Sequence, residues 1–312
     1  MTSRSRRSRG AGRRTAADGP SCPGRQEQAE IGRMAEAGQG RKRATRYNFI
    51  VGLPRSGSTM LAALLNQNPR FRASGTSAAQ IIFQMLYNQF SGDSELSALL
   101  DDDQRRAVMH GVIDAVHHDR GDAEVVFDTN RRWLLRAEQL VALYPLCRFI
   151  ITVRDPARVV SSLERARRSL TFRQSKLFDP DTTLAQRVNR LMSDDGIVGQ
   201  SLNLVQDALM GPLSERMIVI DYDRLLAAPA ETMDLLYTFL REPTFAHDFQ
   251  DFSFDLPRLD TFLNTPGLHS IRGPLRPATT EMLLPEKMAE RLSERAVWTD
   301  VPGTQAVRLL AG

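Results

Sequence analysis

The sequence predicts a three-layer α/β fold in which helices flank a central, mostly parallel sheet of five strands. From Tyr47 onward, short apolar runs alternate with longer amphipathic segments, the pattern of a parallel sheet with helical crossovers. The runs are apolar on nearly every residue, as expected for strands that are buried on both faces. A turn containing two glycines directly follows the first run and opens a helical segment. Together these observations predict a P-loop-like fold, in which a loop after the first strand binds phosphate.

The expected strands are the short apolar runs. In chain order they are residues 47–51, 71–73, 124–127, 148–153 and 216–220, of which the second is the weakest. The expected helices have apolar residues at helical spacing, and they are 58–66, 77–90, 104–118, 132–144, 156–169, 183–209 and 230–240. The remainder, 241–312, is rich in proline, glycine, threonine and phenylalanine, so we expect loops with one helix around 286–297.

The first 46 residues differ from the rest of the chain in composition. They hold twelve Lys/Arg and four Asp/Glu, a net charge of +8, whereas the whole chain has +4 and residues 47–312 therefore −4. They contain no aromatic residue, so they cannot bury enough apolar surface to offset the entropy of ordering. We expect a disordered, Arg-rich tail over 1–46 and a folded domain over 47–312. The alternative is an over-long reading frame whose true start is Met34.

Composition excludes several classes of protein. No apolar stretch approaches the roughly 18 residues of a membrane-spanning helix, and no apolar segment of a secretory signal follows the paired arginines. Two cysteines, Cys22 and Cys147, cannot form a disulfide framework, and no Cys/His spacing suits a metal. The basic charge belongs to the tail, which argues against specific nucleic-acid binding by the domain. We expect a cytoplasmic, metal-free protein.

A phosphate-binding loop is expected between the first strand and the first helix. Gly52 begins the segment Gly-Leu-Pro-Arg-Ser-Gly-Ser-Thr, which ends at Thr59. Glycines let backbone N–H groups approach anionic oxygens, and the helix N-terminus adds a partial positive charge. The spacing fits the nucleoside-triphosphate pattern G-x-x-x-x-G-K-[ST], but Ser58 stands at the lysine position and Arg55 lies inside the loop. We therefore expect an anion other than the triphosphate of ATP.

The loop resembles the 5′-phosphosulfate loop of sulfotransferases that use 3′-phosphoadenosine-5′-phosphosulfate (PAPS). That loop reads P-[KR]-[ST]-G-[ST]-[ST], and residues 54–59 match it position by position. The resemblance implies that PAPS is the sulfuryl donor and that this loop binds it. The donor-binding residues implied here are Arg55, Ser56, Gly57, Ser58 and Thr59.

A second segment extends the resemblance. In the family, an arginine at a strand end and a serine eight positions later hold the 3′-phosphate, and these positions fall on Arg154 and Ser162. Arg154 would emerge at the carboxyl end of a parallel strand, where open α/β sheets bind ligands. The alternative for Arg154 is an ordinary ion pair with Asp155.

Two weaker matches complete the resemblance, which then covers nearly the whole expected domain. Residues 219–240 resemble the family's Y-E-D-L segment, which implies that Tyr222 lies near the nucleotide. Residues 269–273 stand where the family has a basic loop over the 3′-phosphate and adenine, which implies Arg272 and Gly273 as donor-binding residues.

The activity that the resemblance implies is in-line transfer of a sulfuryl group from PAPS to an acceptor hydroxyl or amine. A sulfuryl group carries less negative charge than a phosphoryl group, so backbone amides, Arg55, Ser58 and Thr59 could stabilise the transition state without a metal ion. Arg55 is the expected catalytic cation, because it would lie against the bridging oxygen where charge develops.

The general base is the least determined part of the expected site. Asp128 is the first candidate, because it follows the strand 124–127 and would face the same sheet edge as Arg55. The alternative role for Asp128 is a helix N-cap or turn carboxylate. Asn130 and Arg131 could instead orient the acceptor. The competing candidates for the base are His110, His117 and His118, which lie on the helix before that strand.

Two other functions are compared with sulfuryl transfer. A P-loop kinase using ATP and Mg²⁺ could use Asp128 for its metal, but it would need a lysine at Ser58. A non-enzymatic binding module would act through the basic tail. The acceptor stays open among glycan, lipid, metabolite and peptide, and so does the oligomeric state. The stretch 81–87 could line an apolar acceptor cleft or form a plain core helix.

Overall fold

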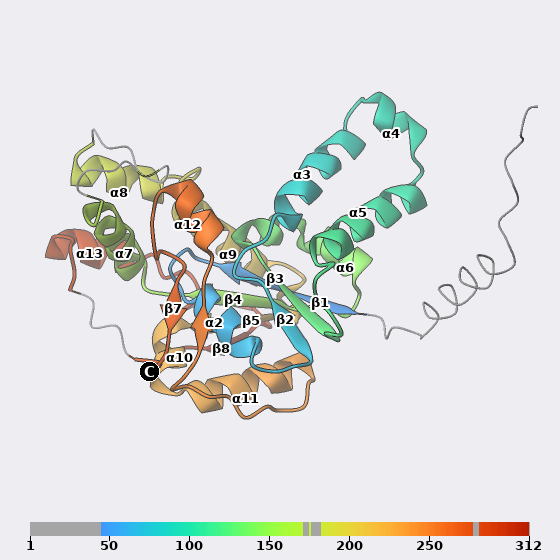
Figure 1. The fold of residues 1–312 in the computed structure, drawn as a ribbon. Helices are drawn as coiled ribbons and strands as arrows, with labels where there is room; N and C mark the ends of the chain where they lie inside the picture. The colour runs from blue at the N-terminus through green and yellow to red at the C-terminus, as the bar shows by residue number, and fades with distance from the viewer. Residues whose placement is uncertain (1–44, 171–174, 176–181, 277–280, 312) are drawn as a thin grey trace, which may run out of the picture. The chain divides into compact units, whose positions relative to one another are not determined.

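Six parallel strands form the central sheet of the protein. The structure is a computed structural model and describes residues 45–170, 175, 182–276 and 281–311 (Figure 1). The strand order is β2-β3-β1-β4-β5-β8, and every neighbouring pair is parallel. The strands are β1 (Arg46–Gly52), β2 (Phe71–Ala73), β3 (Val125–Thr129), β4 (Phe149–Val153), β5 (Met217–Asp221) and β8 (Val307–Leu309).

The prediction of an α/β fold is confirmed, and the number of strands is corrected from five to six. All five expected strands are present, with ends that differ by one or two residues. The sixth, β8, pairs with β5 through Ile218 to Ile220 and has two exposed residues among its three. An edge strand this short, with two exposed residues, has no apolar run from which the sequence could predict it. Residues 1–44 of the expected tail lie outside the described residues, so the tail stays a prediction.

Helices connect the strands, and the described residues contain no helix long and apolar enough to cross a membrane. The helices are α2 (Ser58–Leu65), α3 (Ala79–Phe90), α4 (Glu95–Leu99), α5 (Asp102–Val116), α6 (Ala137–Leu143), α7 (Pro156–Arg168), α8 (Leu184–Met192), α9 (Gly199–Met210), α10 (Tyr222–Ala227), α11 (Pro229–Leu240), α12 (Pro257–Leu263) and α13 (Glu286–Ser293). A 3-10 helix, η1 (Arg131–Arg136), precedes α6, and another, η2 (Ser214–Arg216), precedes β5.

The expected long helix over 183–209 is two helices. The chain leaves the helical path after α8 and re-enters it at α9, because Gly196 and Gly199 pack against backbone. A Cβ on Gly196 would lie 2.1 Å from the carbonyl oxygen of Arg190, and a Cβ on Gly199 2.1 Å from that of Ser193. Only glycine allows this close approach, so the break is built into the sequence.

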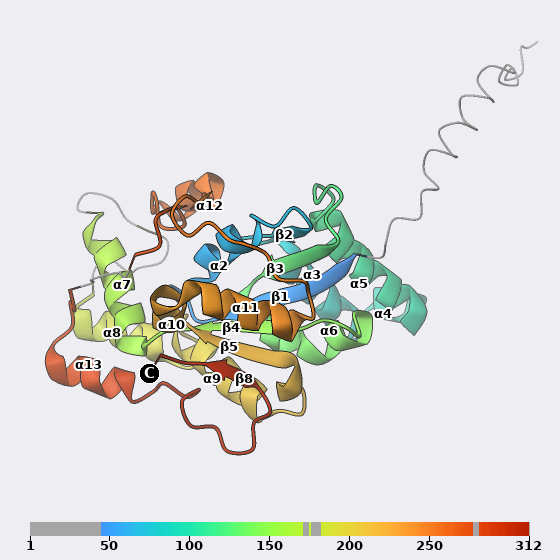
Figure 2. The same cartoon turned by 90° about the horizontal axis from the view of Figure 1, so that it is seen from below.

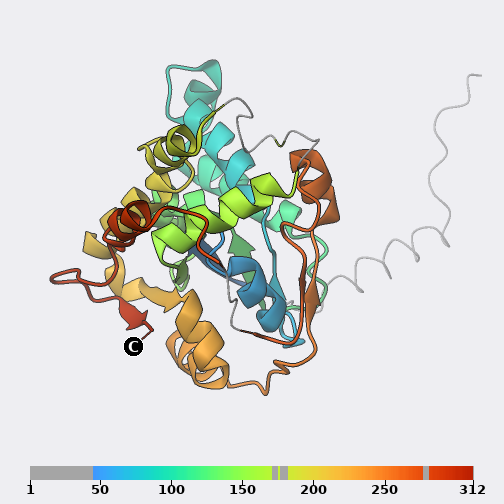
Figure 3. The same cartoon turned by 90° about the vertical axis from the view of Figure 1, so that its left-hand side faces the viewer.

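The region expected to be loops also holds a small antiparallel ribbon. Its strands are β6 (Ser253–Phe254) and β7 (Ile271–Arg272), and helix α12 lies between them in the chain. The ribbon packs beside α2, and Figure 3 shows it in orange next to that helix in blue. This packing brings the segment between α12 and β7 close to the loop after β1.

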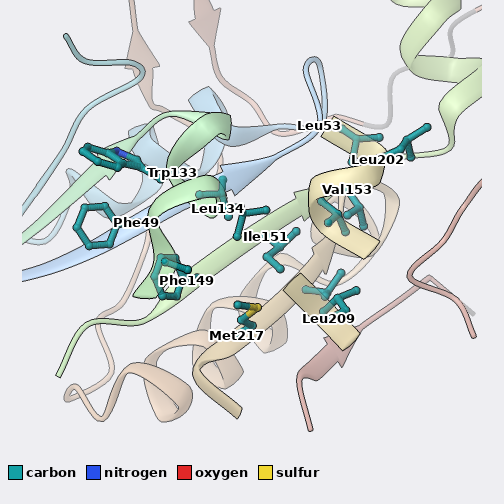
Figure 4. Packing of buried hydrophobic residues seen from close by; sticks show 14 of the residues in the cluster. Phe49, Leu53, Trp133, Leu134, Phe149, Ile151, Val153, Leu202, Leu209 and Met217 are labelled. Carbon is teal, nitrogen blue, oxygen red and sulfur yellow. The ribbon is translucent and has the colours of Figure 1, made fainter. Parts of the chain in front are cut away.

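Apolar side chains on both faces of the sheet complete the three layers. Successive residues of a strand point to opposite faces, so Phe49 and Ile50 of β1 enter different clusters. The cluster around Phe49 includes Phe149, Trp133 and Leu202, and Figure 4 shows these side chains packed between the strands and the neighbouring helices. The cluster around Ile50 joins α2, α10 and α11, and Figure 2 shows α10 and α11 together beside the sheet.

Candidate active site

A cavity of about 530 Å³ lies at the carboxyl ends of the central strands. Its wall combines the loop after β1, the ends of β3 and β4, the start of α3, the start of α10 and the segment from α12 to β7. Open parallel sheets bind ligands at this edge, because the loops that leave neighbouring strands meet there.

The chain turns tightly at the end of β1 and in the loop that follows, because three residues there have positive φ angles. These are Gly52 (φ 116°), Arg55 (φ 61°) and Gly57 (φ 94°). A Cβ on Gly52 would lie 2.1 Å from the carbonyl oxygen of Thr152 on β4, so only glycine fits there. A Cβ on Gly57 would lie 2.8 Å from Cδ2 of the Tyr222 ring. Because these two glycines have no side chain, the backbone of the loop packs directly against β4 and the Tyr222 ring.

Ser56 fixes the loop from behind and does not line the cavity. Its buried hydroxyl donates to the carbonyl oxygen of Leu53 at 2.6 Å and lies 2.7 Å from Oγ1 of Thr152. Ser58 and Thr59, which begin α2, do line the cavity. No side chain caps the N-terminus of α2. The first N–H groups of that helix could therefore bind an anion in the cavity.

Two arginines meet at this loop, and both line the cavity. Nε of Arg55 donates to Oγ of Ser162 on α7 at 3.2 Å, and Nη1 donates to the carbonyl oxygen of Leu268 at 2.5 Å. The guanidinium of Arg154 stacks over the ring of Tyr222, 4.1 Å from its centroid, and Nη1 lies 3.5 Å from the carbonyl oxygen of Arg55.

Burial lowers the pKa of both arginines, and for Arg55 the charge of Arg154 lowers it further. The largest cause in both cases is the removal of the cation from water, which a bound anion would offset.

Asp128 is buried on the other side of β3. Its Oδ1 accepts from Nε1 of Trp133 at 2.5 Å, while its Oδ2 accepts from the hydroxyl of Ser77 and lies 2.6 Å from Nε2 of His117. It is fully buried and does not line the cavity. The structure therefore does not bring Asp128 to Arg55, and its expected role as the base has no support from this geometry.

The three competing histidines also lie away from the cavity. His117 is buried against Asp128, His110 contacts Asp114 at 3.3 Å, and His118 is exposed beyond the end of α5. A different histidine, His269, does line the cavity. Sequence reasoning placed it in the expected basic loop without giving it a role.

The sulfotransferase family model matches residues 48–246, which is more than half of the chain. The matched span contains the whole phosphate-binding loop, the two arginines and Tyr222. The chain belongs to the sulfotransferase family. The predicted enzyme class is thereby confirmed, and the kinase alternative is not favoured. No curated protein matches the chain at a significant level.

Solved structures similar to this sulfotransferase are distant in sequence. The sulfotransferase domain of the curacin biosynthetic pathway is 18% identical, covers 81% of this chain and 98% of its own, and has a TM-score of 0.47. The sulfotransferase domain of the Synechococcus PCC 7002 olefin synthase is 17% identical, with 85% and 98% coverage and a TM-score of 0.47. A sulfotransferase from Alicyclobacillus acidocaldarius is 18% identical, with 72% and 94% coverage and a TM-score of 0.45.

Most of the residues that were expected to bind the donor lie together at the cavity. Ser162 joins the site through its bond to Arg55, whereas Ser56 supports the loop. Arg272 and Gly273 follow Ile271, which lines the cavity, but they do not line it themselves, and Arg272 is exposed on β7. The expected residues that do line the cavity are Arg55, Gly57, Ser58, Thr59, Arg154 and Tyr222.

Another part of the cavity wall is mostly polar, and sequence reasoning found only some of its residues. Asn130, Arg131 and Arg132 line it after β3, and Gln80 and Ile81 line it at the start of α3. Gln80 is 1% exposed, and its Nε2 has no hydrogen-bond partner among the described residues. Of the apolar stretch 81–87, Ile81 alone lines the cavity. An acceptor at this wall would meet amide and guanidinium donors.

The described ranges hold no group of three or more His, Cys, Asp or Glu side chains placed to bind a metal ion.

Proposed function

We propose that this sulfotransferase moves a sulfuryl group from PAPS to a hydroxyl or amine of an acceptor by in-line transfer. The observation that carries the proposal is the pair of buried arginines, Arg55 and Arg154, beside the uncapped N-terminus of α2. Ser58 stands where a nucleoside-triphosphate loop has lysine, so the cation comes from inside the loop.

The chain offers separate contacts for the two ends of the donor. The loop amides with Ser58 and Thr59 would hold the 5′-phosphosulfate, and Arg154 with Ser162 would hold the 3′-phosphate. The Tyr222 ring, fixed by Gly57 and stacked on Arg154, closes this side. Arg272 and Gly273 would reach the nucleotide only at the margin of the cavity.

Arg55 supplies the electrostatic part of catalysis in this proposal. When bound, the donor contributes the sulfuryl group and a phosphate leaving group that gains negative charge. Arg55 is held toward the cavity by its bonds to Ser162 and Leu268, so it is oriented before the reaction begins. A cation that is oriented before the reaction stabilises developing charge strongly. Residues at the polar wall, Asn130 and Arg131 among them, would orient the acceptor.

The acceptor class stays open among glycan, lipid, metabolite and peptide, and the cytoplasmic location stays a prediction.

Thermal unfolding of the full chain tests the proposed donor. The ligands are 3′,5′-phosphoadenosine and, separately, ATP, each with and without Mg²⁺. A ligand at about a hundred times its dissociation constant adds roughly 2.7 kcal/mol, which moves the midpoint by several degrees. We expect a shift with 3′,5′-phosphoadenosine that does not depend on Mg²⁺. A shift that occurs only with ATP and Mg²⁺ would contradict the proposal and favour the kinase.

A further inference from the structure

We propose that His269 is the general base of this sulfotransferase and that Asp260 is its positioning residue. The inference rests on the proposed sulfuryl transfer and adds the residue that accepts the proton of the acceptor. The observation that carries it is a histidine that lines the cavity while both oxygens of one buried carboxylate hold it from behind.

Two separate hydrogen bonds join His269 to Asp260. Nδ1 of His269 lies 2.6 Å from Oδ1 of Asp260, and the backbone N–H of His269 donates to Oδ2 at 3.1 Å. Asp260 is 3% exposed. An ionised carboxylate can only accept hydrogen bonds, so Nδ1 carries the ring hydrogen and Nε2 keeps its lone pair. The structure gives Nε2 no hydrogen-bond partner among the described residues. This is the tautomer that a general base requires.

The local fold explains why residues nine positions apart meet. Asp260 lies in α12, which ends at Leu263 and is followed by Asn264 in the left-handed conformation (φ 54°). The chain then folds back, with the N–H of Thr265 bonded to the carbonyl oxygen of Asp260 at 2.9 Å. Ser270, which follows His269, donates to Oδ1 of Asp255 at 2.6 Å. Hydrogen bonds thus hold the chain both before and after His269.

The same segment also touches the catalytic arginine. Leu268, which precedes His269, accepts a hydrogen bond from Nη1 of Arg55, and Arg55 and His269 line one cavity. Burial and Arg154 lower the pKa of Arg55, and the carboxylate of Asp260 opposes that shift. Asp260 is therefore within electrostatic reach of Arg55. By contrast, the pair of His117 and Asp128 is buried away from the cavity.

The proposed step balances without another reactant. His269 takes the hydroxyl proton onto Nε2 while a lone pair of the acceptor oxygen forms the new bond to sulfur. The bond between sulfur and the bridging oxygen breaks, and its electron pair stays on the phosphate of 3′,5′-phosphoadenosine. Asp260 stays ionised and stabilises the imidazolium. The charged groups around the ring are Asp260 on α12, Asp255 beside Ser270, Arg55 in the loop, and Arg131, Arg132 and Arg154 on the other walls.

Turnover with water as the acceptor tests the inference, because it requires no knowledge of the natural acceptor. The full chain is given PAPS, and release of 3′,5′-phosphoadenosine is measured from pH 5 to pH 9 for wild type, His269→Gln and Asp260→Asn. We expect His269→Gln to lower the rate about 10²- to 10⁴-fold and to abolish the acid limb of the profile. Asp260→Asn should move that limb to lower pH, because the imidazolium loses its carboxylate partner. His118→Gln, an exposed histidine of the same chain, should behave as wild type.

Binding of 3′,5′-phosphoadenosine, measured by thermal shift on the same variants, separates this inference from the proposed function. We expect His269→Gln to keep the wild-type shift. An unchanged rate and profile in His269→Gln would overturn the inference while leaving sulfuryl transfer intact. Loss of the shift in that variant would also overturn it, because His269 would then be a donor contact. A folded wild type that neither binds 3′,5′-phosphoadenosine nor consumes PAPS would instead contradict the proposed function.

Nuclear magnetic resonance of ¹⁵N-histidine-labelled protein gives a readout without turnover. We expect the His269 ring hydrogen on Nδ1 in wild type and a mixture of tautomers in Asp260→Asn. A ring hydrogen on Nε2 in the wild type would contradict the proposed base.

Discussion

Arg55 and Ser162 are 107 residues apart in the chain, and Nε of Arg55 donates a hydrogen bond to Oγ of Ser162 at 3.2 Å. The bond joins the loop after β1 to the helix after β4, the two segments that the sequence identifies separately. It places the side chain of Arg55 between the expected contacts for the 5′-phosphosulfate and the 3′-phosphate.

Removing the Arg55 guanidinium should abolish catalysis and leave the fold intact. We expect Arg55→Ala to lower kcat at least 100-fold, the scale of losing one preorganised donor to developing charge. Arg55→Lys should keep part of the rate, because it keeps the charge and loses the second hydrogen bond. Steady-state kinetics with PAPS, together with circular dichroism, measure both. A folded Arg55→Ala variant with normal kcat would show that the cation is not used.

Arg154 should control donor affinity. We expect Arg154→Gln to weaken binding of 3′,5′-phosphoadenosine about 10- to 100-fold by calorimetry, because a charge-assisted contact to phosphate is lost at a buried position. Arg158→Gln is the matched control, since Arg158 is exposed on α7. Equal losses in the two variants would mean that general positive charge, and not the position of Arg154, determines affinity.

Gly57 should not tolerate a side chain. Gly57→Ala brings a Cβ to 2.8 Å from Cδ2 of Tyr222 at a φ of 94°. We expect a loss of about 1 to 3 kcal/mol in the free energy of unfolding and weaker binding of 3′,5′-phosphoadenosine. Gly121→Ala is the control, because its φ is also positive (60°) but a Cβ there meets nothing within 4 Å. If both variants lost equal stability and both kept binding, the contact with Tyr222 would have no role.

Glu164 should make stability depend on pH in the acid range. Burial acts to raise its pKa, but hydrogen bonds from Arg167, Arg187 and Arg168 outweigh burial and lower the pKa to about 2. Its stabilisation is therefore complete above the ordinary value of 4.5 and is lost as pH falls toward 2. We expect about 2 to 3 kcal/mol from this group between pH 5 and pH 2.

Urea unfolding of wild type and Glu164→Gln at pH 5 and pH 2 measures this contribution. The two proteins should differ at pH 5 and converge at pH 2. A constant difference at both values would mean that Glu164 contributes through packing and not through its charge.

The sequence predicted those parts of the fold that depend on contiguous residues. Strands such as β1 and β4 are buried on both faces, so their runs of apolar residues identify them. The edge strand β8 has no such run, because two of its three residues are exposed. The break between α8 and α9 depends on the contact of Gly196 with a carbonyl oxygen, which periodicity does not report.

The same distinction, between features that depend on contiguous residues and features that depend on distant contacts, applies to the candidate site. The loop after β1 presents its backbone and adjacent side chains to the cavity, so its local sequence pattern was sufficient to predict where it lies. Asp128 shows the opposite case: successive strand residues face opposite sides, and it is Thr129, not Asp128, that lines the cavity. The pairing of His269 with Asp260 needs the turn after α12, and no spacing rule connects the two residues. The position of a residue in the chain therefore predicted which edge of the sheet it lies at, but it did not predict the direction in which its side chain points.

The most direct test of the central claim is transfer of radioactive sulfur from [³⁵S]PAPS by the wild-type full chain, in the absence of Mg²⁺, to a panel of hydroxyl and amine acceptors with water as the reference. The account predicts that ³⁵S leaves the donor, that 3′,5′-phosphoadenosine forms in equal amount, and that both fall together in Arg55→Ala. A folded wild-type protein that leaves PAPS intact with every acceptor and with water would contradict it. So would an Arg55→Ala variant that releases ³⁵S and 3′,5′-phosphoadenosine as fast as wild type.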